Sequence, residues 1–464
     1  MSDKSLNSEQ LVRRDFLKGA AGALGGAAFA GKLSGETLGP AADPIPAEEQ
    51  AARATRGLPT PIIKDIKVIT TQPAGARLVV VKVITDQDGL YGYGCATFTQ
   101  RADLVTPAVE KYLKPLLIGQ PADRIEDTWQ ACYNSSYWRS GGVLYNAISG
   151  VDEALWDIKG RQANMPVYQL LGGKTREAAL TYATVGGTDA AEAIDRVRGA
   201  MDKGFKCIKV MVGVPGMSSY GPRKGPSLKG LHAGAVFEPG PYMRLTRKML
   251  EACRAQLGEE IELIHDVHER VSAHQAVQFA KELEPIRLFY LEDVLSPEHI
   301  EYFRQIRQQC ATSLAMGELF NNPHEWQPLI EGRLIDYIRC HVSQIGGLTQ
   351  ARKVAILAEQ FGVKTAWHGP PDVSPVGHTA QLHLDLASTS FGIQEGGIIQ
   401  GLEAEIFTGC ATYKDGYLWA SDAPGWGVEV NEELAAQHPF HEDRRHLNGG
   451  WGEIRRLDGS IINQ

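Results

Sequence analysis

Three acidic residues recur along this chain at one spacing, and each of them ends a short apolar run. Asp266, Glu292 and Glu318 follow one another at intervals of 26 residues. The runs before them (261–264, 288–291 and 314–316) have the character of strands buried on both faces of a parallel sheet. Such an interval holds one strand, one helix and two loops. The spacing therefore predicts three successive βα units, with a carboxylate at the carboxyl end of each strand.

The position of these carboxylates predicts a metal site. In a (β/α) barrel, the carboxyl ends of the strands form the face that carries chemistry. Three carboxylates converging there would repel one another unless a cation lay between them. Oxygen ligands on rigid strands suit Mg²⁺, which keeps coordination positions for water and substrate. Any one acid could instead cap the helix after its strand, but three at equal spacing favour the metal.

Two histidines flank the first carboxylate. Side chains alternate along a strand, so Asp266 and His268 are expected on one face and His265 on the other. An imidazole two residues after a metal ligand is a candidate for general acid or base work. His268 is therefore a catalytic candidate, whereas His265 is expected to be a packing histidine.

Four motifs together resemble a known family. They are Asp266-x-His268, Leu291-Glu-Asp293, Gly317-Glu318 and Trp367-His-Gly-x-x-Asp-x-Ser-Pro-Val-Gly377. This set is similar to the mannonate dehydratase-like branch of sugar-acid dehydratases in the enolase superfamily, over a stretch from about residue 62 to 460. The resemblance implies an α/β fold, a modified TIM barrel (β/α)7β with an N-terminal α+β capping domain. It also implies one Mg²⁺ per active site, bound by Asp266, Glu292 and Glu318.

The resemblance also implies roles for residues outside the metal site. Tyr220, in a Gly- and Pro-rich insertion at 213–240, matches a tyrosine that carries a proton together with a neighbouring arginine. The insertion is expected to be an active-site lid. Further positions match substrate contacts: Glu318, Arg339, His368, Asp372 and Glu395. Arg339 could instead be an internal ion-pair partner of a strand-end acid.

Three positions depart from the family pattern. Lys209 stands where an arginine is usual, and a lysine lacks the planar fork that would hold Tyr220. A desolvated Lys209 could itself act as a base. Thr99 and Thr184 align where the family has asparagine and histidine. These differences indicate an enzyme of another specificity, or one with weak mannonate activity.

The N-terminus predicts export. Arg13 and Arg14 precede a mild apolar run that ends in Ala28-Phe-Ala30, which is typical of a twin-arginine signal peptide over 1–30. A basic tail is the alternative. The run is too short and Gly-rich for a stable membrane anchor, so a periplasmic protein is expected. The rest of the chain is predicted to form four segments. They are a linker at 31–61, the capping domain at 62–175, the barrel at 176–400 and a C-terminal segment at 401–464 that packs on the capping domain.

Composition narrows the classes of partner. A chain of 464 residues with 43% hydrophobic content can bury a large core in two domains. The net charge of −8, without a basic run beyond the extreme N-terminus, excludes nucleic acid as an expected partner. The 7 cysteines include no CxxC pair and are expected to be buried thiols. The expected partners are a small-molecule sugar acid and further copies of the chain in a homo-oligomer.

The sequence therefore predicts a Mg²⁺-dependent dehydratase of an aldonate or uronate, mannonate- or gluconate-like, with Tyr220, His268 and Lys209 as catalytic candidates. It would remove the proton next to the carboxylate and expel the β-hydroxyl, giving a 2-keto-3-deoxy sugar acid. An epimerase or racemase could use Lys209 and His268 from opposite faces of the same enolate. A non-catalytic acid-sugar binding protein is the alternative from another class.

Overall fold

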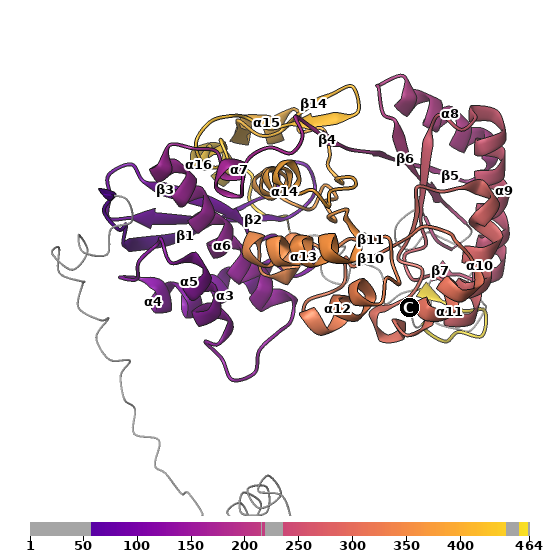
Figure 1. The fold of residues 1–464 in the computed structure, drawn as a ribbon, viewed down its shortest axis with the longest axis horizontal. Coiled ribbons are helices and arrows are strands. Elements are labelled where there is room, and N and C mark those ends of the chain that lie inside the picture. The colour runs from indigo at the N-terminus through magenta and orange to yellow at the C-terminus, as the bar shows by residue number, and fades with distance from the viewer. Residues whose placement is uncertain (1–56, 215, 219–234, 442–453, 463–464) are drawn as a thin grey trace, which may run out of the picture. The chain divides into compact units, whose positions relative to one another are not determined.

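The computed structural model describes residues 57–214, 216–218, 235–441 and 454–462. The predicted signal peptide, nearly all of the predicted linker, and Tyr220 lie outside these residues. The described chain begins with an antiparallel sheet of order β1-β2-β3, in which β1 is Ile63–Thr71, β2 is Leu78–Thr85 and β3 is Tyr91–Cys95 (Figure 1). Alternate residues of β2 enter two different hydrophobic cores, since Val79 and Val81 pack in one and Leu78 and Val80 in the other.

Helices complete the capping domain. The elements are a 3-10 turn (Thr99–Arg101), α3 (Ala102–Ala108), a π-helical turn (Val109–Leu113), α4 (Lys114–Leu117), α5 (Ile125–Tyr133), α6 (Gly142–Ala163) and α7 (Val167–Leu170). The long helix α6 lies directly against β3. A β-carbon at Gly92 or Gly94 would collide with the backbone of α6. The Tyr-Gly-Tyr-Gly pattern of β3 is thus required for this close packing.

Seven parallel strands form the barrel sheet. Their order is β5 (Ala183–Gly187), β6 (Cys207–Val212), β8 (Glu262–Asp266), β9 (Tyr290–Glu292), β10 (Leu314–Met316), β11 (Tyr337–Ile338) and β12 (Lys364–Thr365). The segment 391–394 closes the ring, because Phe391 bridges Thr365 and Gln394 bridges Thr181 ahead of β5. This arrangement confirms the predicted (β/α)7β barrel with an α+β capping domain.

Helices follow the barrel strands in sequence and cover the outside of the sheet. They are α8 (Ala190–Met201), α9 (Pro239–Leu257), α10 (Ala273–Leu283), α11 (Tyr302–Gln309), α12 (Pro323–Glu331), α13 (Leu348–Phe361) and α14 (Pro375–Ala387), with 3-10 turns at Glu284–Ile286, Pro297–His299 and Val342–Ile345. The capping domain docks on α13 through α6. Asp152 of α6 accepts hydrogen bonds from Thr349 N (2.9 Å) and Oγ1 (2.5 Å), which places a carboxylate at the N-terminus of α13.

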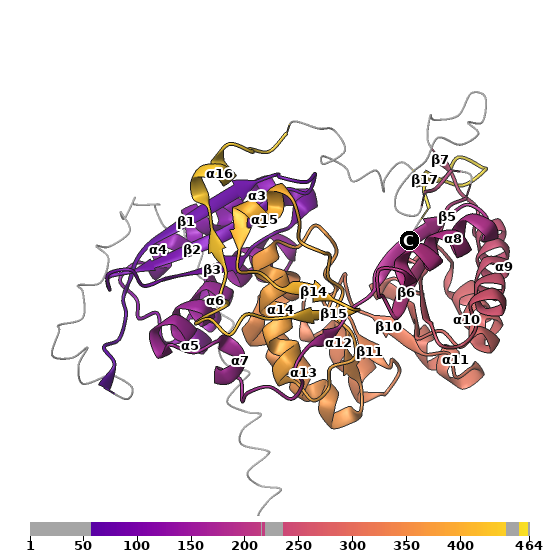
Figure 2. The ribbon, with the colours of Figure 1, turned by 90° about the horizontal axis from the view of Figure 1, so that it is seen from above.

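The C-terminal segment contacts both parts of the fold. Its elements are α15 (Leu402–Ile406), β13 (Phe407–Thr408), β14 (Thr412–Lys414), β15 (Tyr417–Trp419), β16 (Glu429–Val430), α16 (Glu432–Ala436) and β17 (Ile454–Arg455). β15 pairs with β4 (Ala179–Leu180) at the entrance to the barrel, and β17 pairs with β7 (Ala235–Val236). Figures 1 and 2 show α16 beside the β1–β3 sheet, where Lys82 and Glu432 form an ion pair of 2.5 Å.

Candidate active site

The barrel interior changes character toward the carboxyl ends of the strands. Its apolar layer is formed by Tyr182, Cys207, Ile264, Tyr290, Ala315, Ala366 and Ile393. Because side chains alternate along a strand, residues two positions further on face the same interior. Those positions hold Thr184, Lys209, Asp266, Glu292 and Glu395. An apolar plug is therefore followed by a charged layer at the edge where the predicted site lies.

Four charged residues form an alternating ring in this layer. Lys209 Nζ lies 3.0 Å from Glu292 Oε1 and 3.2 Å from Glu395 Oε1. Arg339 Nη2 lies 2.9 Å from Glu292 Oε1 and 2.7 Å from Glu395 Oε2. All four residues are buried. Each cation thus contacts both anions, which is the arrangement that can keep four charges out of water.

The ring changes the interpretation of Lys209 and Arg339. Burial would raise the pKa of Glu395, but Lys209 and Arg339 outweigh it and hold that pKa well below its usual value. Two carboxylates next to a lysine favour its charged form, which argues against Lys209 as a base. The Arg339 side chain is fully buried, which favours the ion-pair alternative over a substrate contact.

A group of three carboxylates fits a divalent cation. One ligand atom each from Asp266, Glu292 and Asp293 lies within 4.8 Å of the others. Asp266 Oδ1, Glu292 Oε2 and Asp293 Oδ1 are buried and have no hydrogen-bond partner among the described residues. Burial raises the pKa of Glu292, as do Asp266 and Glu395, against the effect of Arg339 and Lys209. Glu292 thus has one oxygen held by cations and a second oxygen left for a metal ion.

Asp293 is a residue that the sequence reasoning missed. Strand alternation places it opposite to Glu292, away from the site. In the structure β9 ends at Glu292, and Asp293 adopts a left-handed φ of 42°. This conformation is rare outside glycine, asparagine and aspartate, and it breaks the alternation. The directly adjacent acid in the Glu-Asp pair was the only available signal.

Glu318, the third predicted ligand, lies against two histidines. Its Oε1 is 3.4 Å from His268 Nε2, and its Oε2 is 3.2 Å from His368 Nε2. Burial would raise the pKa of Glu318, but His368 and His268 bring it well below its usual value. The preceding Gly317 has a φ of 146° and leaves no room for a β-carbon beside Arg339 and Cys340. The structure therefore places Glu318 at the site but outside the three-carboxylate group.

His265 within β8 and His268 two residues after its end have different environments, as the sequence predicts, but the cause is the backbone after the strand and not strand alternation. β8 ends at Asp266, and His268 and Glu269 are consecutive left-handed residues with φ of 54° and 58°. Burial would lower the pKa of His268, but Asp266 and Glu318 raise it. His265 is fully buried, 2.7 Å from both Tyr242 Oη and Val210 O, and burial lowers its pKa to about 4. His265 is a packing histidine.

A second histidine pair borders Glu318. His341 follows β11, His368 follows β12, and their Nδ1 atoms are 2.7 Å apart. Asp372 is half-buried nearby, and burial raises its pKa against the effect of His368. The strand ends thus bring His268, Glu318, His368 and His341 into one row of neighbouring side chains.

The other predicted site residues are only partly placed. Thr184 is an exposed residue of β5, in register with Lys209 of β6. Thr99 begins a 3-10 turn, but its side chain lies outside the description. Tyr220 and most of the predicted lid also lie outside the described residues.

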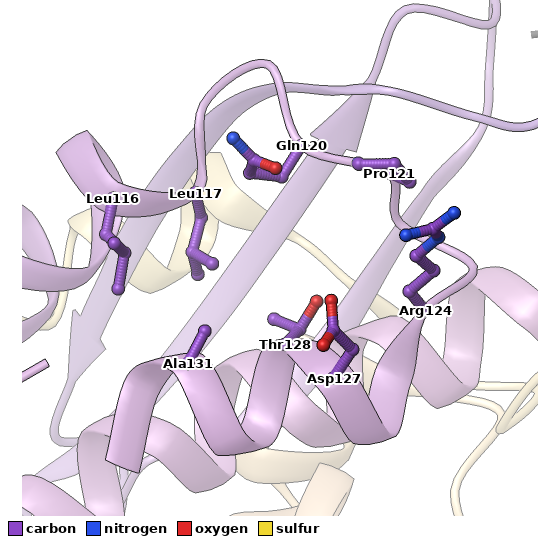
Figure 3. A pocket seen from close by; sticks show the side chains of 8 residues that line it. All are labelled: Leu116, Leu117, Gln120, Pro121, Arg124, Asp127, Thr128 and Ala131. Carbon is purple, nitrogen blue, oxygen red and sulfur yellow. The ribbon is translucent and has the colours of Figure 1, made fainter. Parts of the chain in front are cut away.

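A cavity elsewhere does not belong to this site. It has a volume of about 300 Å³ and lies in the capping domain between α4 and α5. Figure 3 shows Leu117, Arg124 and Asp127 among the side chains that line it. No residue of the strand-end groups lines it, so it has no part in the chemistry argued from them.

Comparison with known families agrees with this geometry. The description "Enolase C-terminal domain-like" matches residues 192–434, and "Mandelate racemase / muconate lactonizing enzyme, N-terminal domain" matches residues 54–172. The chain belongs to the enolase superfamily. The two matches cover most of the barrel and of the capping domain.

Relatives of known sequence and structure match most of this chain. A D-galactonate dehydratase family member from Enterococcus gallinarum is 48% identical over 400 residues, covering 86% of this chain and 98% of the relative. A second family member, from Musicola paradisiaca, is 47% identical over 417 residues, with 86% and 98% covered. The crystal structure of an enolase from Pantoea ananatis with bound D-gluconate and Mg has a TM-score of 0.83 at 44% identity, covering 87% of this chain and 100% of that one.

Proposed function

We propose that this chain is a Mg²⁺-dependent dehydratase of a sugar acid of the aldonate or uronate class. The observation that carries the proposal is the group Asp266, Glu292 and Asp293, whose three unpartnered, buried oxygens lie at the carboxyl ends of barrel strands. Buried carboxylate oxygens without partners are costly unless a cation binds them. Asp266, Glu292 and Asp293 would hold the ion, and the family resemblance adds Glu318 as a ligand.

The reaction needs a bound carboxylate, a base and an acid. When bound, Mg²⁺ supplies positive charge that makes the proton next to the substrate carboxylate more acidic. Tyr220 is the proposed proton acceptor, by family resemblance. His268 would donate a proton to the β-hydroxyl as it leaves as water, because it lies beside Glu318 at the edge of the site. The resulting enol becomes a 2-keto-3-deoxy sugar acid.

Relatives support the substrate class. The curated relatives carry the name of the D-galactonate dehydratase family, and the related crystal structure holds D-gluconate with Mg. Gluconate, galactonate and mannonate differ only in hydroxyl stereochemistry, so the polar residues around the substrate decide among them. His368 and Asp372 are the proposed contacts, together with Thr99 and Thr184. Arg339 and Glu395 would not contact the substrate directly. They would act through their ion pairs with Lys209 and Glu292.

The ring bears on the alternatives. An epimerase or racemase that used Lys209 as one of its two bases would need a neutral amine, whereas Lys209 lies between Glu292 and Glu395. This geometry disfavours that route. A non-catalytic binding protein would retain the same carboxylate group without turning over any sugar acid, and only an activity measurement separates it from a dehydratase.

A screen of hexonates and hexuronates tests the function. D-gluconate, D-galactonate and D-mannonate are tested first, each in the presence of Mg²⁺ and in the presence of EDTA. A 2-keto-3-deoxy product is expected in Mg²⁺ and not in EDTA. In D₂O, an epimer with deuterium next to the carboxylate and no loss of water would instead indicate the epimerase. Saturable binding with neither product would indicate a binding protein.

We also propose that the protein is exported to the periplasm and assembles as a homo-oligomer. The Arg13-Arg14 pair supports export, and no helix within the described ranges 57–214, 216–218, 235–441 and 454–462 is long and apolar enough to cross a membrane. Tyr137 and Trp138 support assembly, since 88% and 85% of their surfaces are exposed on one loop of the capping domain. Light scattering of wild type and of Trp138→Ser would test whether this loop lies in a subunit contact.

A further inference from the structure

The row of side chains at the site ends in a histidine to which no role has been given. His341 is only 4% exposed, and its ring centroid lies 4.9 Å from that of His368. Its Nδ1 lies 2.7 Å from Nδ1 of His368, a distance at which one nitrogen donates a hydrogen bond to the other. Its Nε2 is buried and has no hydrogen-bond partner among the described residues. Nδ1 is thus the one ring nitrogen of His341 that has a hydrogen-bond partner among the described residues.

Geometry restricts where the protons of this pair can be. A neutral imidazole carries its proton on one of its two nitrogens, and only one of the two Nδ1 atoms can donate across their 2.7 Å contact. If His341 accepted at Nδ1, its own proton would sit on Nε2. A buried N–H without a partner is rarer in proteins than an unsatisfied acceptor. The favoured arrangement has the proton of His341 on Nδ1, donated to His368.

We propose that His341 is a positioning residue, which donates its Nδ1 proton to Nδ1 of His368 and thereby fixes His368 in the tautomer that carries its proton on Nε2. The ring nitrogen that one partner occupies decides which nitrogen the other end presents. Burial lowers the pKa of His341 to about 3, so His341 is a neutral ring that can hold only one proton.

The consequence for the site is a defined polarity at His368. With Nε2 protonated, His368 presents a hydrogen-bond donor to Glu318 and to a carboxylate or hydroxyl oxygen of a bound sugar acid. It cannot accept a proton at that atom. This part of the inference rests on the proposed function, whereas the tautomer itself does not.

Two substitutions at His341 isolate the donor. Asparagine and aspartate each place a polar atom near the position of Nδ1. His341→Asn can still donate an N–H there, whereas His341→Asp can only accept. Protein labelled with ¹⁵N-histidine is examined by long-range ¹H–¹⁵N correlation without substrate, both with Mg²⁺ and with EDTA. The His368 signals are identified by their loss in His368→Gln.

Wild type and His341→Asn are expected to show His368 protonated on Nε2 and bare on Nδ1. His341→Asp is expected to move a proton onto Nδ1 of His368. The control is His383→Gln, which removes an equally buried histidine that accepts from Tyr168 N at 3.2 Å, and it should leave the His368 signals unchanged. If His341→Asp does not fold, wild type and His341→Asn still decide the matter.

Wild-type His368 with a proton on Nδ1, or on both nitrogens, would overturn the proposal. So would a His341→Asp spectrum identical to wild type. Once a substrate is found, kcat should fall by roughly 10²-fold in His341→Asp and be largely retained in His341→Asn. A protein without any turnover but with the expected tautomer would refute the dehydratase function and leave the role of His341 standing.

Discussion

Lys209→Met tests whether the buried amine is a charge partner or a base. Lys209 Nζ lies 3.0 Å from Glu292, 3.2 Å from Glu395 and 3.9 Å from Asp266, and only 2% of its side chain is exposed. Two unit charges at such a distance attract by roughly 5 kcal/mol at an effective dielectric of about 20. Desolvation of the amine cancels part of that gain, and removing one partner of a buried ion pair costs about 3–5 kcal/mol.

We therefore expect the metal-free protein to lose about 3–5 kcal/mol of its free energy of unfolding in Lys209→Met. Metal binding should change in the opposite direction. Removing a positive charge next to Glu292 and Asp266 should tighten Mg²⁺ binding at least about tenfold, which corresponds to ~1.4 kcal/mol. Mg²⁺ at about 100 times its Kd would then restore ~2.7 kcal/mol of stability.

Urea unfolding in EDTA measures the loss of unfolding free energy, and urea unfolding in Mg²⁺ measures the stability that the metal restores. Calorimetric titration measures the Mg²⁺ affinity. Lys209→Arg is the matched control, because it keeps the charge but cannot be deprotonated in a protein. It should unfold within about 1 kcal/mol of wild type and retain turnover. A Lys209→Met protein as stable as wild type in EDTA would refute the ring, and a Lys209→Arg protein that folds normally but has lost all turnover would restore Lys209 as a base.

Four further outcomes are expected. Glu292→Gln should weaken Mg²⁺ binding strongly in calorimetric titration, since a hard anionic ligand is lost, and unchanged affinity would remove Glu292 from the metal site. His268→Asn should lower kcat by roughly 10²-fold or more with metal affinity nearly intact, so wild-type turnover would exclude His268 from proton transfer. Replacing Arg13 and Arg14 by lysine should leave precursor in the cytoplasm, and mature periplasmic protein in cell fractions would contradict export. Burial lowers the pKa of His383 to about 3, below its unfolded value of 6.5, so the unfolded chain gains the proton first and stability falls with pH below 6.5. His383→Gln should lose about 2 kcal/mol less than wild type between pH 6.5 and 4.5 in urea unfolding, and parallel curves would contradict the assignment.

The strand-end carboxylates show how far sequence reasoning extended. Asp266, Glu292 and Glu318 were predicted from spacing alone, because a βα unit has a nearly fixed length and strand ends meet at one edge of a barrel. The alternation of side chains also holds along β6, β8 and β9, from the apolar layer to the charged layer. It fails one residue later at Asp293, where a left-handed backbone turns the side chain toward the metal group.

The contacts of the charged residues could not be predicted in the same way. Arg339 and Glu395 are 56 residues apart in the chain, and the family resemblance assigns both to substrate, with an internal ion pair as the alternative for Arg339. Their mutual ion pair depends on how β11 and the segment 391–394 lie around the closed barrel. The pairing of His341 with His368 likewise needs the bridge between the ends of β11 and β12.

The sequence by itself determined the repeating βα architecture, the edge at which the acids gather and the cation that suits them, because these follow from periodicity and ligand chemistry along a local stretch. Only the tertiary structure decided which carboxylate contacts which lysine, arginine or histidine side chain. In a low-dielectric interior, interaction energies depend steeply on distances of a few ångströms between residues remote in sequence. Lys209 lies between Glu292 and Glu395, and Glu318 faces two histidines, because closure of the barrel brings the ends of these strands together.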